Sequence, residues 1–586
     1  MSAEQTELLY SPYGEVSYEM FRRLRRAYAD KSGMIATLDD IGMTRFPVLL
    51  RPRGFGKSTF VQMLKCFYDI SYSGMYEELF SGTEVYEKNL AGHNAYHVID
   101  FDFSGVSGVR EDVLLRSFII AVNSGINDFM VRYPDFVFRP TEAEKETPSG
   151  LIRAFVDAYK RYPGKRSLYL LIDEYDNFAN NLLSADRELF RVITSTGGFL
   201  RDFYAAVKDG TKRYIAKTFI TGVSSVSLDS LTSGFNISLN VTADKNFNNY
   251  AGFTEGELKK LIPKLVDLKS IGVTAEEVIA RMKTVYDGYC FSWQAGNTLF
   301  NSSMCLYYLN IIRKTGEFVA PEKYLDPASD HDGSKLRQLF DIAADDLADY
   351  VINTYLAGDD FYLEKLAENI NLNQTAKYND VQLLSMLYYL GYLTIDPEHS
   401  TSDGLMLRVP NLYMSRLFAH CTMDLKLRNS SVFREQCLDI SGLLQSADDL
   451  AGFAVSCTQF LSVIFTSQVL AHMSEMALNL VLYAKLSSLR EVVAELQKSL
   501  RVPGQGENFA DLVITVNKGK SSECVYLIEL KYIPKNDATA ATISRRAQEA
   551  AGQVQTYRNA LEFRGKMVKP CAMVFAGAEC VHCAIQ

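Results

Sequence analysis

The sequence predicts an α/β protein in three parts: a parallel-sheet domain, a mainly helical middle region and a C-terminal domain of the order α-β-β-α-β. Three observations predict this organisation. Short apolar runs alternate with helix-length stretches between Arg45 and Val223, the pattern is mainly helical from Glu255 to Ser431, and strand-like segments return near Phe509. Such alternation is typical of a parallel sheet covered on both faces. The predicted domains span residues 1–255, 256–432 and 433–586.

The composition is that of an ordinary globular protein. Of the 586 residues, 47% are hydrophobic and 22% are charged, which excludes a largely disordered or collagen-like chain. The net charge of −9 excludes a uniformly basic surface, so any contact with nucleic acid must be local or bridged by metal ions. The first twenty residues lack a signal-peptide pattern, and the ten cysteines are scattered. We therefore expect a cytoplasmic protein with reduced thiols and no contact with a membrane.

Four apolar runs in the first domain are predicted strands, because turn or polar residues bound each of them. They are Phe46–Leu50, His97–Phe103, Leu168–Ile172 and Tyr214–Thr221. The segments between them are long enough for helices. Nearer the N-terminus, the basic cluster Arg22–Arg26 is interpreted as a solvated helix face or, alternatively, as a patch for DNA or a partner.

A glycine-containing loop follows the first predicted strand, and Gly56-Lys57-Ser58 then opens a helix. Loops of this kind bind phosphates through backbone N–H groups, with a lysine on the β- and γ-phosphates and a hydroxyl on Mg²⁺. Arg51 stands where the phosphate-loop pattern has its first glycine, and Gly54 can supply the lost backbone freedom. The alternative is an ordinary glycine-rich turn at the start of a helix. The loop residues expected to bind nucleotide are Arg53, Gly54, Phe55, Gly56, Lys57, Ser58 and Thr59.

Acidic residues end a later strand of the same domain. Asp173 follows the apolar run Leu168–Ile172, so the strand carries it to the carboxyl edge of the sheet, where it can hold Mg²⁺. Glu174 is then placed to polarise a water molecule against the γ-phosphate. Thr221, before Gly222, could contact the γ-phosphate or that water. The alternative is a buried strand that ends in a solvated acidic turn.

The middle region contains a helix followed by a hairpin. Leu383–Leu390 reads as a helix and Leu405–Val409 as a strand after a polar turn, which indicates a winged-helix-like unit. Helical pattern returns from Val432 to Leu500, with the last predicted helix at Ser474–Leu496.

The C-terminal domain has its own strand pattern. The predicted elements after Leu496 are the strands Phe509–Val516 and Cys524–Tyr532, the helix Ala538–Leu561 and the strand Met567–Phe575. Asp511 lies in an otherwise apolar strand, where a carboxylate is costly to bury unless it is paired or bound to metal. Glu529 and Lys531 are two residues apart on the next strand and therefore share a face.

Two carboxylates and a lysine are the groups that metal-assisted phosphodiester cleavage uses. Asp511 and Glu529 would hold Mg²⁺ through oxygen ligands, and Lys531 would orient the attacking water or stabilise the developing charge. The alternative is a strand pair with a structural Glu–Lys salt bridge.

Several blocks in this order resemble a known family, the AAA-ATPase-like bacterial proteins with a C-terminal nuclease-like domain of the PD-(D/E)XK type. The blocks are Tyr28–Lys31, Arg51–Ser58, Ile172–Asp176, Thr221–Val223, Ser233–Asn236, Gly252–Thr254 and Tyr286–Ser292. The resemblance covers most of the chain. The same arginine replaces the first glycine throughout that family, whereas Gly54 departs from its usual second arginine.

The resemblance implies an AAA-ATPase-like domain of the phosphate-loop type and a restriction-endonuclease-like C-terminal domain. It also implies further site residues. Gln553 and Tyr557 match a Gln-x-x-x-Tyr pattern in some nucleases of that fold, and Glu475 matches an extra metal-binding acid that some of them carry.

The sequence therefore predicts an ATP-binding and ATP-hydrolysing protein coupled to a Mg²⁺-dependent nuclease domain. Its expected cofactors are ATP and Mg²⁺, and its expected partner is nucleic acid, with DNA favoured. An assembly of several copies with an arginine finger, such as Arg201 or Arg213, is a further expectation. The alternative is a nucleotide-dependent switch whose C-terminal domain binds nucleic acid or a partner without cutting it.

Overall fold

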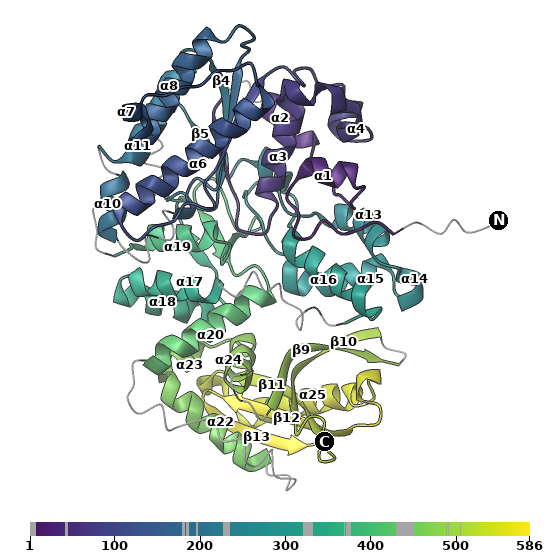
Figure 1. The fold of residues 1–586 in the computed structure, drawn as a ribbon. Coiled ribbons are helices and arrows are strands. Elements are labelled where there is room, and N and C mark those ends of the chain that lie inside the picture. The colour runs from purple at the N-terminus through teal and green to yellow at the C-terminus, as the bar shows by residue number, and fades with distance from the viewer. Residues whose placement is uncertain are drawn as a thin grey trace, which may run out of the picture. The chain divides into compact units, whose positions relative to one another are not determined.

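The structure is a computed structural model (Figure 1). It describes residues 8–40, 45–178, 182, 187–194, 197–226, 235–319, 321, 332–368, 370, 377–428, 450–487, 489, 492–503 and 506–586. The predicted boundary at residue 432, Cys437, and Ser233 and Gly234 of the family resemblance lie outside these residues. The chain divides into unit 1, which is Met1–Ser329, Asp341–Ala344 and Tyr362–Asn411, and unit 2, which is Asp330–Phe340, Asp345–Phe361 and Leu412–Gln586. The three-domain division stays a prediction.

Unit 1 contains a parallel sheet with the strand order β2-β3-β4-β1-β5. Its strands are β1 (Pro47–Leu50), β2 (His97–Asp102), β3 (Leu168–Asp173), β4 (Ile215–Gly222) and β5 (Leu239–Asn240). The four predicted strands are confirmed to within one residue at each end, and β5 was not predicted. β4 lies between β1 and β3, with Ile220 paired to Val48 on one side and to Ile172 on the other.

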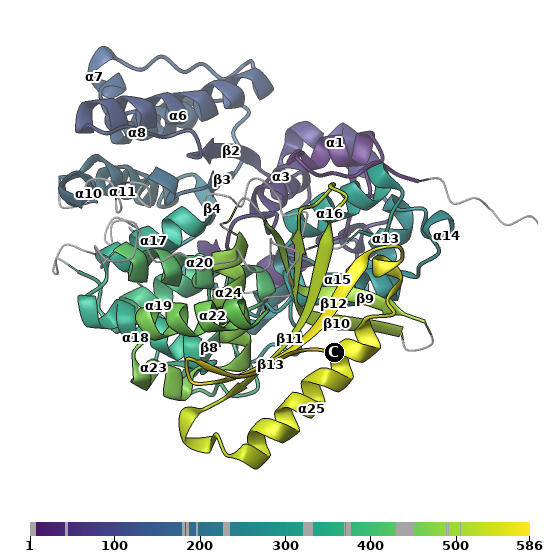
Figure 2. The same cartoon turned by 90° about the horizontal axis from the view of Figure 1, so that it is seen from below.

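Helices cover both faces of this sheet, as predicted (Figure 2). The helix after β1, α3 (Lys57–Tyr68), lies on one face, where Lys65 pairs with Asp100 of β2 at 2.9 Å. The neighbouring residue Phe101 points to the other face and packs against Phe203. That face carries α6 (Glu111–Arg132), α8 (Pro148–Arg161) and α11 (Phe199–Thr211).

The other described helices of unit 1 are shorter or lie outside the sheet. Those before β4 are α1 (Tyr18–Arg23), α2 (Gly33–Asp40), η1 (Ile70–Met75), α4 (Tyr76–Phe80), α5 (Glu84–Glu87), α7 (Glu142–Lys145) and α10 (Arg187–Thr194). Those after β5 are η2 (Lys245–Tyr250), α13 (Glu255–Leu265), α14 (Leu268–Ile271), α15 (Ala275–Tyr286), α16 (Ser302–Thr315) and α19 (Asp380–Tyr389).

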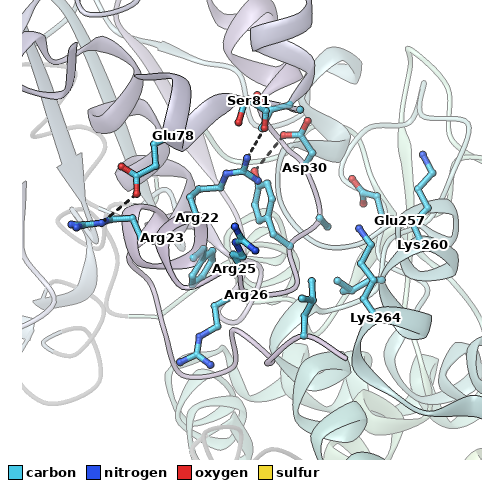
Figure 3. A pocket seen from close by; sticks show the side chains of 17 residues that line it. Arg22, Arg23, Arg25, Arg26, Asp30, Glu78, Ser81, Glu257, Lys260 and Lys264 are labelled. Atoms are coloured by element: carbon cyan, nitrogen blue, oxygen red, sulfur yellow. Dashed lines mark hydrogen bonds and ion pairs between the residues drawn. The ribbon is translucent and has the colours of Figure 1, made fainter. Parts of the chain in front are cut away.

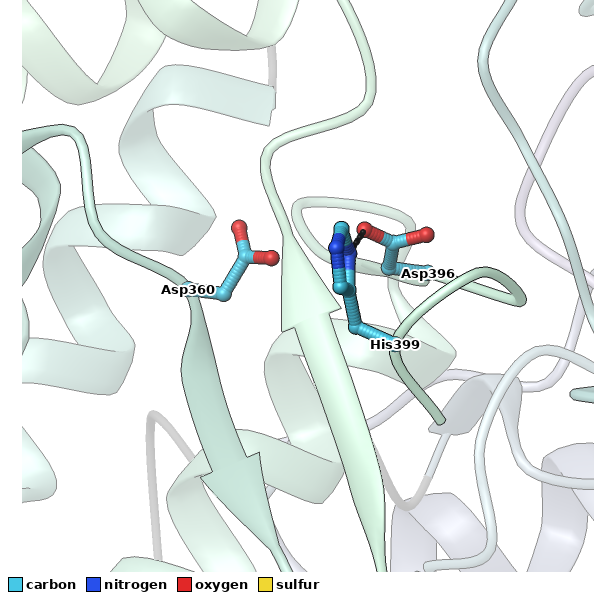
Figure 4. Close-up of side chains that lie close together, drawn as sticks. All are labelled: Asp360, Asp396 and His399. Atoms are coloured by element: carbon cyan, nitrogen blue, oxygen red, sulfur yellow. Dashed lines mark hydrogen bonds and ion pairs between the residues drawn. The ribbon is translucent and has the colours of Figure 1, made fainter. Parts of the chain in front are cut away.

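The predicted helix and hairpin of the middle region are present. After α19, β7 (Thr394–Ile395) pairs antiparallel with β8 (Leu405–Arg408), and β6 (Phe361–Leu363) lies on the other side of β8. The turn between β7 and β8 is held by Asp396, whose Oδ2 lies 2.7 Å from His399 Nδ1 (Figure 4). The same oxygen lies 3.3 Å from Arg408 Nη1. Classification of this segment as a winged helix stays a prediction.

Helix α6 is long and apolar enough to cross a membrane, by length and composition alone. In the structure it lies along β2 of the sheet, and its apolar residues Phe118, Val122, Ile126 and Phe129 are buried there. α6 therefore packs against the sheet through one of its faces.

Unit 2 contains a mixed sheet with the strand order β13-β12-β11-β10-β9. Its strands are β9 (Val492–Val502), β10 (Gly506–Val516), β11 (Cys524–Ile533), β12 (Met567–Ala576) and β13 (Glu579–Ile585). Only the β11–β12 pair is parallel. The predicted hairpin of β10 and β11 is confirmed, with Val513 opposite Leu527.

Unit 2 also contains helices among its described residues. They are α17 (Asp332–Ile342), α18 (Asp345–Ala357), α20 (Leu412–Arg428), α22 (Leu450–Ile464), α23 (Ser467–His472), α24 (Glu475–Ser487), α25 (Ala540–Tyr557) and the short η5 (Lys535–Asp537) and η6 (Leu561–Phe563). α25 packs on β11 and β12, whereas α24 packs on β9 and β11.

The predicted order α-β-β-α-β is wrong in two places. The helix predicted over Ser474–Leu496 ends at Ser487, and Val492–Val502 forms β9 instead. This segment pairs with β10, which supplies its backbone hydrogen bonds. Such pairing with a distant part of the chain overrides a local pattern that favours a helix. β13, next to β12, was also missed. From α24 onward the observed order is α-β-β-β-α-β-β.

The described cysteines are free thiols, as predicted, and most are buried. Those enclosed in the interior are Cys66, Cys290, Cys305, Cys421, Cys457, Cys524 and Cys571.

Candidate functional site

The loop between β1 and α3 turns its backbone carbonyls outward. The carbonyl of Arg53 accepts from the Asn301 side chain, that of Gly54 accepts from Ser303 N–H, and that of Phe55 accepts from Gly252 N–H. In a trans peptide the N–H points opposite to the C=O. The N–H groups of Gly54, Phe55 and Gly56 therefore point into the loop, as anion binding requires.

Two glycines give the loop its shape. Gly54 has φ +79° and Gly56 has φ +91°, both in the left-handed region that favours glycine. A Cβ at Gly54 would also come within 2.8 Å of Asn301 Oδ1. Gly54 thus supplies the backbone freedom that the sequence pattern lacks at residue 51.

Arg51 is buried beneath the loop. Its guanidinium donates to the carbonyls of Leu50, Thr242 and Phe247 at 2.7 to 2.9 Å and lies over the ring of Phe291 at 4.1 Å. Burial lowers the pKa of Arg51. Arg51 ties the start of the loop to the segment after β5, a role that sequence reasoning missed.

The acidic end of β3 meets the loop, as the sequence predicts. The Ser58 hydroxyl hydrogen-bonds to the Asp173 carboxylate, and Lys57 Nζ lies 3.5 Å from Glu174 Oε1. Asp173 is 7% exposed, and burial raises its pKa to about 6. A nearby cation would offset the cost of keeping this carboxylate ionised. Glu174 has φ +52°, a strained conformation for a residue other than glycine.

Thr221 is buried at the end of β4, and its hydroxyl donates to the Leu49 carbonyl at 2.6 Å. Just beyond it, Asp176 accepts from the N–H groups of Val223 and Ser224 at 3.0 and 2.7 Å. A Cβ at Gly222 would collide with the Asp176 carboxylate, which explains the glycine at this position.

A cavity of about 680 Å³ opens above the loop. This volume is within the range of small-molecule sites. Its lining includes Arg53, Gly54, Phe55, Gly56, Lys57, Ser58, Thr59 and Glu174. Asp102, Asn177 and Tyr250 also line it, and the sequence reasoning missed them. Asp102 was detectable by the reasoning used for Asp173, because it too ends a strand and pairs with Asp173 across the sheet.

The predicted acidic cluster of unit 2 lies on one face of the sheet. Val513 and Leu527 pair across β10 and β11 and belong to one hydrophobic cluster with Tyr557 of α25. Asp511 and Glu529 are two residues from this pair, so they lie on the same face, toward α25.

Three carboxylates converge on Lys531. Lys531 Nζ lies 2.8 Å from Glu529 Oε1, 3.4 Å from Glu475 Oε1 and 3.9 Å from Asp511 Oδ2. Glu475 also accepts from Arg546 at 2.8 Å. Asp511 accepts from Gln497, a residue of β9 at φ +49°. Neither residue was predicted: Gln497 belongs to β9, which was missed, and Arg546 reaches Glu475 only through the packing of α25 in the fold.

Burial controls the charge of this cluster. Burial, with the charge of Asp511, raises the pKa of Glu529 to about 7, and burial also raises the pKa of Asp511. Burial alone would lower the pKa of Lys531, but its hydrogen bond to Glu529 and the surrounding carboxylates raise it. The lysine is therefore charged, and Glu529 changes its protonation near neutral pH.

One carboxylate oxygen of the cluster is left unpaired. Glu529 Oε2 is enclosed and has no hydrogen-bond partner among the described residues. Buried polar atoms without a partner are costly, and a bound cation would satisfy this one. Burial and the charges of Glu529 and Asp511 raise the pKa of Tyr557, which hydrogen-bonds to Gln553. All the site residues predicted in unit 2 therefore lie together.

Comparison with known proteins finds a family model that matches part of unit 1. Residues 12–232 match the model of a family described as a predicted AAA-ATPase. This match, over the β1 loop and the acidic end of β3, suggests nucleotide binding or hydrolysis.

One curated relative is a protein of Azotobacter chroococcum mcd 1 named only as an uncharacterized protein in the vnfD 5′ region. It is 27% identical over 293 residues, which are 48% of this chain and 49% of the relative. The chain thus spans about half the length of the curated relative it matches.

Proposed function

We propose that unit 1 binds and hydrolyses ATP with Mg²⁺ in the cavity above the β1 loop. One observation carries this proposal. Beside the inward-pointing N–H groups of the β1 loop, Ser58 hydrogen-bonds to Asp173 and Lys57 pairs with Glu174. Lys57 would bind the β- and γ-phosphates, and Ser58 and Asp173 would hold Mg²⁺, which would neutralise phosphate charge. Glu174 would take a proton from the attacking water.

The test is ATP binding and phosphate release by the full chain. Lys57→Ala should abolish binding, whereas Glu174→Gln should bind ATP and release phosphate at least about 100-fold more slowly. Lys88→Ala is the matched control, because Lys88 is an exposed lysine of the same unit that pairs with Glu84. Equal turnover by Lys57→Ala and Lys88→Ala would exclude the proposed site.

We further propose that unit 2 cleaves nucleic acid with a divalent metal at the cluster around Lys531. Support comes from the enclosed, unpartnered Oε2 of Glu529 beside Asp511. Asp511 and Glu529 would hold the metal, with Glu475 at the edge, and the metal would lower the pKa of a bound water. Lys531 would then release Glu529 and donate to the developing negative charge on the phosphate, with Tyr557 and Gln553 lining the site.

This proposal is tested with linear and plasmid DNA and with RNA, with and without Mg²⁺. Wild type should cut with Mg²⁺ and stop with EDTA, and Lys531→Ala should not cut. Lys535→Ala, an exposed lysine four residues on, is the control and should cut like wild type.

A second candidate is binding without cleavage, as in a nucleotide-dependent switch. It is favoured by the ion pairs of Lys531 and Arg546, which already offset part of the negative charge of the cluster without a metal. Metal-independent DNA binding, with no products at any Mg²⁺ or Mn²⁺ concentration, would support the switch and exclude the nuclease.

A further inference from the structure

A second cavity of unit 1, of about 660 Å³, is lined by basic side chains (Figure 3). Its cationic lining residues are Arg22, Arg23, Arg25, Arg26, Lys260 and Lys264. The carboxylates of its wall are Asp30, Glu78 and Glu257. Six cations and three carboxylates give a formal charge of +3 in a chain whose net charge is −9. The cavity is therefore a local positive region of an acidic protein.

Two of the three carboxylates of the wall have partners outside the cationic lining, and the third pairs with one cation of the lining. Asp30 accepts from the N–H groups of Ser32 and Glu84 at 2.9 and 2.7 Å. Glu257 pairs with Lys31 at 2.8 Å. Glu78 pairs with Arg23. None of these interactions neutralises the remaining cations.

Arg22 is also occupied, because it donates to the carbonyls of Leu79 and Ser81 at 2.6 Å. Arg25, Lys260 and Lys264 make no ion pair with a described residue. Lys260 and Lys264 are four residues apart on α13 and share a face, and they approach the cavity from the side opposite the arginines (Figure 3).

Arg26 adds an enclosed donor to this wall. Its guanidinium lies 5.4 Å from the centre of the Tyr10 ring, and its Nε is enclosed without a hydrogen-bond partner in the described part of the chain. Such a donor is costly unless a ligand or water accepts from it. Cations of this kind bind phosphate oxygens well, arginine through two parallel hydrogen bonds.

We propose that this cavity binds a small ligand with several phosphate groups. Its volume suits a small molecule, and its cationic side chains approach from two opposite sides (Figure 3). The cavity adjoins the nucleotide cavity, since Phe21, Tyr28, Ala29 and Leu261 line both. The basic cluster Arg22–Arg26 is thus one wall of a binding site rather than only a solvated helix face.

The test uses the full chain with Lys57→Ala, so that the β1 loop does not dominate, and titrates inorganic tripolyphosphate calorimetrically at fixed ionic strength. We expect one saturable site. Lys260→Gln with Lys264→Gln should weaken binding about tenfold for each lost charge-assisted contact. Lys259→Gln with Lys269→Gln removes the same charge from neighbouring exposed positions outside the cavity lining and should change affinity by less than about twofold.

Three results would overturn the proposal. The first is an absence of saturable tripolyphosphate binding. The second is equal weakening by the two double variants, which would assign binding to the general field of the surface. The third comes from a single-stranded oligonucleotide of about 12 nucleotides. If it binds more tightly than tripolyphosphate and depends on the same two lysines, the surface is a nucleic-acid site instead.

Discussion

Asp176→Ala is the sharpest test of how unit 1 is held together at the nucleotide cavity. Asp176 is fully buried and accepts from the N–H groups of Val223 and Ser224 and from the Ser224 hydroxyl, at 2.7 to 3.0 Å. It thereby joins the segment after β3 to the segment after β4. The alanine variant removes all three acceptor contacts and fills none of the space.

The magnitude follows from the two backbone N–H groups. Each loses the Asp176 carboxylate as its acceptor in a buried position, at a cost of about 1–3 kcal/mol. The carboxylate itself is costly to bury, and burial raises its pKa, so part of this loss is offset. We expect a net decrease of about 2–4 kcal/mol in the free energy of unfolding, a large part of the usual 5–15 kcal/mol. Asp176→Asn keeps one acceptor oxygen and should lose about half as much.

The assay is urea unfolding followed by tryptophan fluorescence. Trp293 is the single tryptophan of the chain and belongs to unit 1, so its signal reports that unit. Asp157→Ala is the control, because Asp157 is an exposed acid that pairs with Arg213 and should contribute at most about 1 kcal/mol. If Asp176→Ala shifts the unfolding free energy no more than Asp157→Ala, the proposed anchor is refuted.

Three further predictions concern titration, strain and metal. Burial lowers the pKa of His97 to about 4, so the neutral ring is favoured in the folded state. The free energy of unfolding should therefore fall by at most about 3 kcal/mol as the pH drops from 6.5 to about 4. His97→Gln should flatten this dependence in urea unfolding. Because Glu174 has φ +52°, Glu174→Gly should be about 1 kcal/mol more stable than Glu174→Ala, and the usual order, alanine above glycine, would refute the strain. Because the pKa of Glu529 is raised to about 7, the protonated carboxyl stabilises the metal-free fold at low pH. This contribution to stability is lost as the pH rises through about 7. Mg²⁺ should therefore raise the melting temperature of wild type at pH 8 but not that of Glu529→Gln, and a Mg²⁺ effect that persists in the variant would exclude Glu529 as a ligand.

The strands of unit 1 were predictable because both faces of the sheet are covered. A strand buried on both sides is apolar throughout, as in Leu168–Ile172, and such runs stand out from sequence alone. Ser58 and Asp173 were predictable for a related reason, since a strand end and a helix start fix where each residue lies. The roles proposed for these residues remain predictions.

What the sequence concealed depends on contacts between distant residues. Val492–Val502 has helix-like local spacing and becomes a strand only because β10 pairs with it. Gln497 and Arg546 reach the acidic cluster through that unpredicted strand and through the position of α25. Asp102 was passed over because the predicted strand ran one residue further, to Phe103, and so did not end at this acid.

Arg51 has a consequence for how chains of this kind are detected. A search that requires glycine at this position would reject the loop, yet the guanidinium fastens the loop to three carbonyls that a glycine could not reach. Lysine could not reproduce the fork of donors, so even that substitution should loosen the loop while preserving its charge. The arginine that replaces the glycine of the pattern therefore fixes the start of the loop. The backbone conformation that needs glycine occurs three residues later, at Gly54.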